Sequence, residues 1–192
     1  MHAREIRRRA IQIRKIRRIH RIAGIYFFIF ILIITITGLL LAWKKNSADL
    51  IAVSTQKGTT TQIDEWMSIS DLTDVAIAHY KSEFPQKITD LPDRIDARPS
   101  AGTIKFLFSN NYYEIQLDAA TGELLYAGYR IADIIENIHD GSIVDKLLGT
   151  ENQIIKLIYS TLLGIATLTF SITGFWVWNE RNKIRKIKNR TP

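Results

Sequence analysis

The stretch IAGIYFFIFILIITITGLLLAW, residues 22–43, decides the fold, because none of its 22 residues is charged. A second uncharged stretch of the same length, LIYSTLLGIATLTFSITGFWVW, occupies residues 157–178. At 1.5 Å of rise per residue each forms a helix of about 33 Å, enough to cross a hydrocarbon core of about 30 Å. Aromatic residues lie near the ends of both stretches, as is typical of membrane interfaces. Two transmembrane helices are predicted, in preference to buried helices of a soluble core.

The charge of the chain follows the same division. Residues 1–21 carry nine Lys or Arg and one Glu, and residues 179–192 carry six Lys or Arg and one Glu. Residues 44–156 carry eleven basic and seventeen acidic residues, although the whole 192-residue chain has a net charge of +7. The positive-inside rule then predicts that both termini are cytoplasmic and that residues 44–156 are periplasmic or extracellular. We expect a multi-pass protein of a bacterial inner membrane, with the lipid bilayer and not nucleic acid as its partner.

The basic segment of residues 1–21 has an apolar stripe at helical spacing among its arginines. The stripe consists of Ile6, Ala10, Ile13, Ile16 and Ile19. This pattern predicts an amphipathic helix that lies on anionic lipid headgroups before the chain turns into the membrane. Residues 179–192 are expected to form a second basic cytoplasmic tail.

Residues 44–130 are predicted to fold as a small extracytoplasmic domain. Residues 44–67 form a linker with one short strand at residues 60–64. Ser68 and Asp71 match a capping pattern, which predicts a helix from there to Phe84, before Pro85. Alternation of apolar and polar residues then predicts strands at residues 103–108, 112–117 and 123–129, with an edge strand at 94–98. The expected fold is α+β, one helix on an antiparallel sheet, followed by an interfacial amphipathic segment over residues 131–156.

Three segments of the chain resemble a known family. The helix ISDLTDVAIAHYKSEFP and the strand pair YYEIQLDAATGELL, with its Asp-x-x-Thr-Gly-Glu turn, resemble the PepSY domain. IHRIAGIYFFIFILIITITGLLLAW resembles the first helix of the PepSY-associated transmembrane family. ENIHDGSIVDKLLG and LLGIATLTFSITGFWVW resemble its later His-x-Gly element and closing helix. The resemblance covers residues 15–181 and implies two transmembrane helices around a PepSY domain.

The resemblance also implies a function. Members of the family include ferric-siderophore reductases of the inner membrane that carry b-type haem on histidines. By this resemblance His20 and His139, each at a membrane boundary, are candidate axial ligands of haem b, and the chain is an electron-transfer subunit for ferric-siderophore reduction or iron uptake. The competing interpretation is that both histidines are polar anchors at the boundary.

One chain holds too few boundary histidines for two bis-histidine haems. The two boundaries are about 30 Å apart, so one haem cannot use both histidines. A homodimer, with His20 facing His20 and His139 facing His139, supplies the missing ligands. The alternative is a non-catalytic accessory or regulatory subunit that presents its PepSY domain within a larger membrane complex.

Other chemistry finds no support in the sequence. The chain has no cysteine, no hydrolase or nucleotide-binding motif, and no sign of a peptidase.

The first span contains Thr35-Ile-Thr-Gly38 and the second Ser171-Ile-Thr-Gly174. We interpret this repeated motif as a helix-packing feature, since small and hydroxyl residues allow close approach of helices in membranes.

Overall fold

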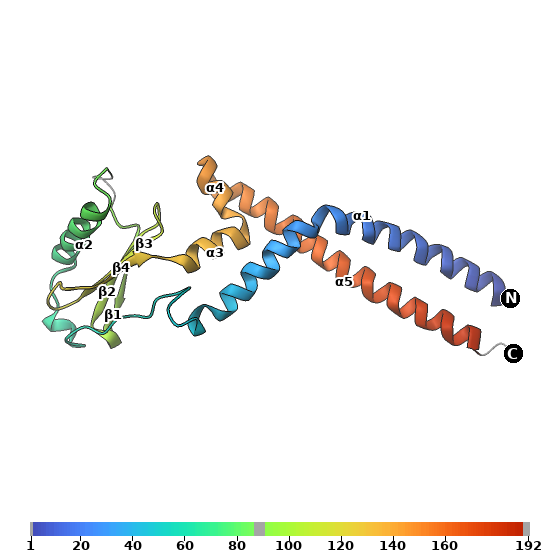
Figure 1. The fold of residues 1–192 in the computed structure, drawn as a ribbon, viewed down its shortest axis with the longest axis horizontal. Coiled ribbons are helices and arrows are strands. Elements are labelled where there is room, and N and C mark those ends of the chain that lie inside the picture. Colours follow the sequence, from blue (N-terminus) through green and yellow to red (C-terminus); the bar gives the residue numbers. More distant parts are fainter. Residues whose placement is uncertain (1, 87–90, 190–192) are drawn as a thin grey trace. The chain divides into compact units, whose positions relative to one another are not determined.

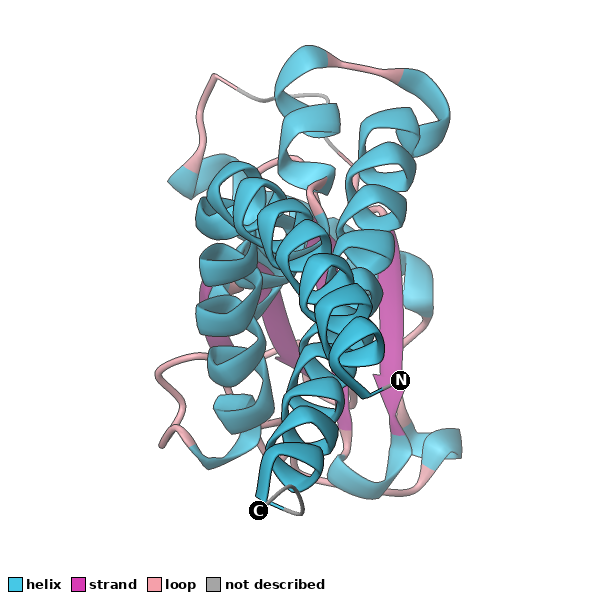
Figure 2. Cartoon of the chain, turned by 90° about the vertical axis from the view of Figure 1, so that its right-hand side faces the viewer, coloured by secondary structure: helices cyan, strands magenta, loops and turns pink. Residues whose placement is uncertain are grey.

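The computed structural model describes residues 2–86 and 91–189 of the chain and divides them into two units. The helical unit consists of described residues within 1–38 and 137–192, and the sheet module consists of those within 39–136. The end of the predicted tail, residues 190–192, lies outside the described residues. Figure 1 shows the order of the elements along the chain, and Figure 2 shows its strands and helices in separate colours.

Both predicted spans are confirmed as parts of long helices. Helix α1 (His2–Trp43) contains the first uncharged stretch, and helix α5 (Ile154–Asn189) contains the second. Each is long and apolar enough to cross a membrane. The most apolar windows of the two helices are only 6% and 11% buried. Core helices of a soluble protein are buried on most sides, so these two exposed helices are those of a membrane protein.

The helix predicted over the basic N-terminal segment is confirmed, and it runs into the apolar stretch as one element. Figure 1 shows that the ribbon of α1 changes direction between its N-terminal part and its apolar part. The placement of the basic segment on lipid headgroups stays a prediction. Helix α1 is continuous from His2 to Trp43. No Pro lies in this stretch, and the residues before Ile22 are good helix formers, so nothing in the sequence ends the helix there. Ile13 is buried while its neighbouring arginines are exposed, so part of the predicted apolar stripe packs inside the helical unit.

The segment after the sheet forms two helices rather than one. Helix α3 (Ile131–Asp140) and helix α4 (Ser142–Leu148) are separated by Gly141. Gly141 has a φ of +82°, which a side-chain-bearing residue rarely adopts, so the chain changes direction there. Val144, Leu147 and Leu148 of α4 are exposed, which agrees with an apolar face at the membrane surface.

The sheet module is built on four antiparallel strands in the order β1-β2-β3-β4. The strands are β1 (Arg94–Arg98), β2 (Thr103–Phe108), β3 (Tyr113–Asp118) and β4 (Leu124–Tyr129). All four predicted strands are confirmed to within one residue at either end. Short 3₁₀ turns occur at Lys44–Asn46, Ile63–Glu65, Pro99–Ala101 and Glu151–Gln153. The predicted strand at residues 60–64 is wrong, because Ile63–Glu65 forms one of these turns.

Helix α2 (Ile69–Glu83) covers one face of the sheet, as predicted. The Ser68 side chain accepts a hydrogen bond from the backbone N–H of Asp71, which confirms the capping pattern. Leu72, Ala76 and Tyr80 of α2 pack against the apolar sides of β2 and β3. The Tyr80 ring stacks on Phe108 with 3.9 Å between centroids. This single layer of helix on sheet is the hydrophobic core of the module.

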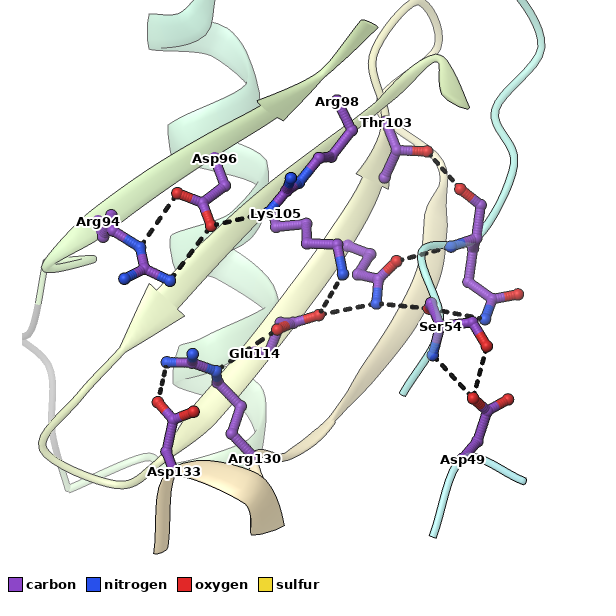
Figure 3. A network of polar contacts seen from close by, with 12 residues as sticks. Asp49, Ser54, Arg94, Asp96, Arg98, Thr103, Lys105, Glu114, Arg130 and Asp133 are labelled. Carbon is purple, nitrogen blue, oxygen red and sulfur yellow. Dashed lines mark hydrogen bonds and ion pairs between the residues drawn. The ribbon is translucent and has the colours of Figure 1, made fainter. Parts of the chain in front are cut away.

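The opposite face of the sheet is polar but also largely buried. Figure 3 shows its network, in which Glu114 accepts from Lys105 at 3.2 Å and pairs with Arg130 at 3.5 Å. Arg130 pairs in turn with Asp133 at 2.5 Å. Gln116 is fully buried and hydrogen-bonds to the backbone of Ser54 and Gln56. The network therefore fastens the chain leaving α1 onto the sheet, and each buried polar group has a partner.

Candidate functional site

The two candidate histidines lie in the helical unit. His20 is on α1, and His139 is in the last turn of α3. Both are half-buried. His79 lies on α2 in the sheet module, and the side chain of His2 is outside the described residues. The structure thus leaves His20 and His139 as the histidines associated with the two spans, and their surroundings define the candidate site.

His139 contacts the first uncharged stretch at Thr37 and Gly38. Its Nδ1 lies 2.9 Å from Oγ1 of Thr37, a residue that is 102 positions away in the sequence. A Cβ on Gly38 would lie 3.3 Å from Cε1 of His139, so the absence of a side chain at this position makes room for the ring. Thr37 is buried. Thr37 and Gly38 of α1 therefore contact the His139 imidazole directly. We call these three residues the His139 site.

Three contacts with α5 hold His139 at this place. Lys156 pairs with the Asp140 carboxylate at 2.7 Å, and the Ser160 hydroxyl donates to the backbone carbonyl of Asp140 at 3.2 Å. A Cβ on Gly141 would lie 2.7 Å from the Tyr159 ring, so only glycine lets this ring pack there. Burial alone raises the pKa of Asp140, but hydrogen bonds from Lys156 and Ser142 bring it below its usual value. Asp140 thus stays ionised and keeps α3 on α5.

His20 makes an equivalent contact with a Thr-Gly pair of helix α5. Its Nδ1 lies 2.8 Å from Oγ1 of Thr173, which is 153 positions away in the sequence. A Cβ on Gly174 would lie 4.0 Å from Cε1 of His20. The ring also meets Phe170 edge to face, with 5.1 Å between centroids. We call this the His20 site. The two sites use the same Thr-Gly pair of the repeated motif, taken from α1 in one case and from α5 in the other.

Each histidine borders an open groove, and the two grooves differ in chemistry. The groove at His20 has a volume of about 610 Å³ and is lined by Arg14, Arg17, Arg18 and Arg21. No salt bridge within the described residues occupies any of these four arginines. The groove at His139 has a volume of about 410 Å³ and is mainly apolar, with Ile34, Leu163 and Leu168 in its wall. The first groove therefore offers cationic side chains that can pair with carboxylates, and the second offers an apolar wall beside an imidazole.

The two sites are too far apart to share a ligand. Thr37 and His20 both belong to α1 and are 17 residues apart, a rise of about 26 Å along a helix. Each site therefore offers one imidazole of this chain. Within residues 2–86 and 91–189, no group of three or more His, Asp or Glu side chains could hold a metal ion. A metal at either site would need the imidazole together with a ligand from elsewhere.

Beyond the sites, an ion-pair cluster joins α1 to α5 near the chain termini. The buried carboxylate of Glu180 accepts from Arg9 at 2.6 Å and from Lys183 at 2.8 Å. Together with the contact between His20 and Thr173, this cluster fixes how the basic end of α1 lies on α5.

The combination of two apolar spans with a helix-on-sheet module defines a membrane protein of the PepSY class. The whole-chain comparison agrees, because the model of the family described as PepSY-associated TM region matches residues 2–181. The chain belongs to this family. No curated protein and no solved structure is significantly similar to it.

Several features of the two candidate sites were missed by the sequence interpretation. Thr37 and Thr173 were attributed to helix packing, whereas the structure places their hydroxyl groups against the two histidines. The available signal for these contacts was the repeated motif, because the chain has two copies of the motif and two histidines at the span boundaries. The four arginines around His20 were interpreted as part of a segment that lies on lipid headgroups, and their gathering in one groove was not predicted.

Proposed function

We propose that this protein is an inner-membrane electron-transfer subunit that carries haem b and takes part in ferric-siderophore reduction or iron uptake. The observation that carries the proposal is the pair of equivalent histidine sites, one toward each end of the two apolar helices. Electron transfer across a bilayer needs a redox centre near each surface. The approximate separation of 26 Å between the sites suits two centres placed in this way.

The residues at each site fit an imidazole-ligated haem. His139 and His20 would each supply one ring nitrogen to the iron, with Thr37 and Thr173 on the other nitrogen. Haem supplies one-electron chemistry between ferric and ferrous iron. The apolar wall at His139 would exclude water from the ring, and Arg14, Arg17, Arg18 and Arg21 would pair with the carboxylates that haem carries.

The single imidazole at each site favours a homodimer. Bis-histidine ligation requires a second copy of the chain, which would place His20 against His20 and His139 against His139. The outward faces of the spans offer apolar side chains for such contact, among them Leu168 and Ile172. In this arrangement α1 and α5 of two copies form a four-helix bundle, a common setting for cofactors held by side chains on facing helices.

The topology proposed for the chain follows from its basic ends. With α1 and α5 in the membrane, the basic residues near both termini would lie in the cytoplasm and the sheet module would face the periplasm or the exterior. A ferric siderophore would then approach from the periplasmic or external side of the membrane, which is the side proposed for the His139 site. Electrons would move from the cytoplasmic His20 site to the His139 site.

A visible spectrum tests this function directly. The full chain is purified in detergent from haem-supplied cells and its spectrum is recorded before and after dithionite reduction. We expect a Soret band that falls by about half in His20→Ala and in His139→Ala and disappears in the double variant, because each site binds its own haem. His79→Ala, remote in sequence from both spans, is the matched control and should keep the full band. A colourless wild-type protein would contradict the proposal.

A second measurement addresses iron. The dithionite-reduced protein, freed of excess reductant, is mixed with a ferric hydroxamate chelate under nitrogen. One electron per haem passes to Fe(III), giving Fe(II) and oxidised haem, so the reduced α-band should decay with equal yield of ferrous iron. Reduced haem that persists in the presence of the chelate would exclude ferric chelates as the acceptor.

An accessory role remains the second candidate, and it is favoured because neither histidine site holds a complete set of metal ligands within the described residues. The described polar groups of the sheet module's second face are taken up by one another, as in the chain from Lys105 through Glu114 to Arg130 and Asp133 (Figure 3). The polar side chains of this face therefore stabilise the sheet module. If the protein is colourless, gentle-detergent purification should recover it with a larger membrane complex. Recovery of haem-loaded protein alone would speak against this role.

A further inference from the structure

We infer that Thr37 and Thr173 are positioning residues that keep the ring proton of His139 and His20 on Nδ1 and leave the Nε2 lone pair of each ring free for a metal. The assignment of the ring proton stands on the hydrogen bonds alone. Only its use in binding haem iron rests on the function proposed above.

The direction of each hydrogen bond follows from the second contact of the threonine. Thr37 Oγ1 lies 2.7 Å from the backbone carbonyl oxygen of Ile33, and Thr173 Oγ1 lies 2.6 Å from that of Thr169. Two oxygens this close need a proton between them, and a backbone carbonyl has none to give. Each threonine hydroxyl therefore donates to its own helix. It has only lone pairs left for the histidine.

The imidazole must then be the donor in both pairs. The Nδ1 of His139, at 2.9 Å, and that of His20, at 2.8 Å, each carry the hydrogen that the threonine oxygen accepts. A neutral imidazole holds one ring proton, so Nε2 keeps a lone pair. Metal ions bind that lone pair, and a hydrogen bond from the other nitrogen is the usual way in which proteins fix the ring of a ligating histidine.

The two other hydroxyl residues of the repeated motif have a different role. Thr35 Oγ1 donates to the carbonyl of Ile31 at 2.7 Å, and Ser171 Oγ donates to that of Thr167 at 2.9 Å. Both are exposed, and no contact with a histidine is present for either within the described residues. The motif thus contains one hydroxyl that only caps a carbonyl of its own helix and one that also orients an imidazole. This difference supplies a control residue within the same turn of helix.

The test follows the ring nitrogens by ¹⁵N NMR. The full chain, labelled at histidine and carrying His2→Asn and His79→Asn, is studied without haem in detergent at a pH where the rings are neutral. We expect both remaining histidines to show a protonated Nδ1 and an unprotonated Nε2. Thr37→Val should move the proton of His139 toward Nε2 and leave His20 unchanged, whereas Thr173→Val should do the reverse. Thr37→Ser and Thr35→Val should change neither ring.

The same variants are then compared for haem binding. Loss of a hydrogen bond to a metal-ligating histidine lowers affinity by about 10- to 100-fold, so Thr37→Val should lower haem affinity by that factor and Thr35→Val should not. Thr37→Ser should restore binding. The inference is overturned if the wild-type rings carry their proton on Nε2, or if Thr37→Val leaves the His139 nitrogens unchanged. A colourless protein with Nδ1-protonated rings would refute haem binding while leaving the proton assignment intact.

Discussion

At the scale of single residues, Asp118 shows how a family motif serves stability. Its carboxylate accepts hydrogen bonds from the backbone N–H groups of Ala120 and Thr121 in the hairpin turn and of Thr59 in the preceding loop. Gly122 completes the turn at a φ of +72°, which favours glycine. The Asp-x-x-Thr-Gly-Glu sequence is therefore a structural device that ties the turn to the loop over the sheet.

Replacing this carboxylate should destabilise the module in a pH-dependent way. Burial raises the pKa of Asp118, but four hydrogen bonds more than offset this and leave the pKa lowered. A lowered pKa means that the stabilisation is complete above the unfolded pKa of about 4 and is lost as the pH falls through the folded pKa. We predict that Asp118→Asn costs about 1–3 kcal/mol of unfolding free energy at pH 7, because the new amide NH₂ opposes backbone donors.

Thermal unfolding of the full chain, followed by circular dichroism between pH 2 and pH 7, measures this effect. The difference between Asp118→Asn and wild type should shrink toward low pH. Asp96→Asn is the control, since Asp96 pairs with exposed Arg94 and Arg98 and should cost below about 1 kcal/mol. An equal loss in both variants, or a difference that does not depend on pH, would contradict the assignment.

The two motif glycines differ in how closely the histidine rings approach. A methyl group at Gly38 would lie 3.3 Å from His139 Cε1, whereas one at Gly174 would lie 4.0 Å from His20 Cε1. The first distance forces the ring to shift and the second is an ordinary contact. We predict that Gly38→Ala lowers haem affinity at the His139 site by about tenfold, the effect of disturbing a ligand's hydrogen bond. Gly174→Ala should leave the His20 site intact, as titrations with haem would reveal.

At the scale of elements, Asp145 connects α4 to the start of α5. Its carboxylate accepts from the backbone N–H groups of Ile155 and Lys156 at 3.0 and 2.7 Å, and from the Thr150 hydroxyl. The first N–H groups of a helix lack partners within the helix, so this side chain caps α5 from a neighbouring element. The backbone carbonyl of the same residue accepts a hydrogen bond from the N–H of Gly149, where α4 ends.

Loss of this cap should loosen the start of α5. We predict faster amide exchange over residues 154–158 in Asp145→Ala, because the two N–H groups then open to solvent or lipid headgroups. Hydrogen exchange with mass spectrometry on the detergent-solubilised chain measures it. Asp74→Ala, an exposed position of α2, should leave those residues unchanged. Protection that is equal in both variants would show that packing alone holds the start of the helix.

At the scale of the whole molecule, each site offers one imidazole, so the proposed haem binding and the proposed dimer depend on each other. The chain has no cysteine, so one engineered cysteine reports on its neighbours. Leu168 is 64% exposed and lines the groove at His139. If two copies share a haem there, Leu168→Cys should form a disulfide-linked dimer under mild oxidation. The same cysteine combined with His139→Ala should cross-link far less, as non-reducing gels would show.

The helix-on-sheet module and the spans could be predicted because their signals are local. Uncharged runs identify residues 22–43 and 157–178, and period-two alternation marks the strands, whose register each turn then fixes. Local signals also explain the error. Residues 60–64 alternate weakly, but Ile63–Glu65 forms a 3₁₀ turn, in which the backbone N–H of Trp66 bonds to the carbonyl of Ile63 instead of to a strand. The basic segment and the apolar stretch form one helix, because no residue between them ends a helix.

The sequence by itself determined the two spans, the segregation of charge, the PepSY-type fold and which histidines lie at the span boundaries. Only the tertiary structure decided that His20 meets Thr173 and that His139 meets Thr37, across 153 and 102 positions of the chain. Hydropathy and periodicity report how each residue relates to its own element. We infer which ring nitrogen carries the proton from the one hydroxyl that the fold brings to Nδ1, and that contact exists only once the helices have packed.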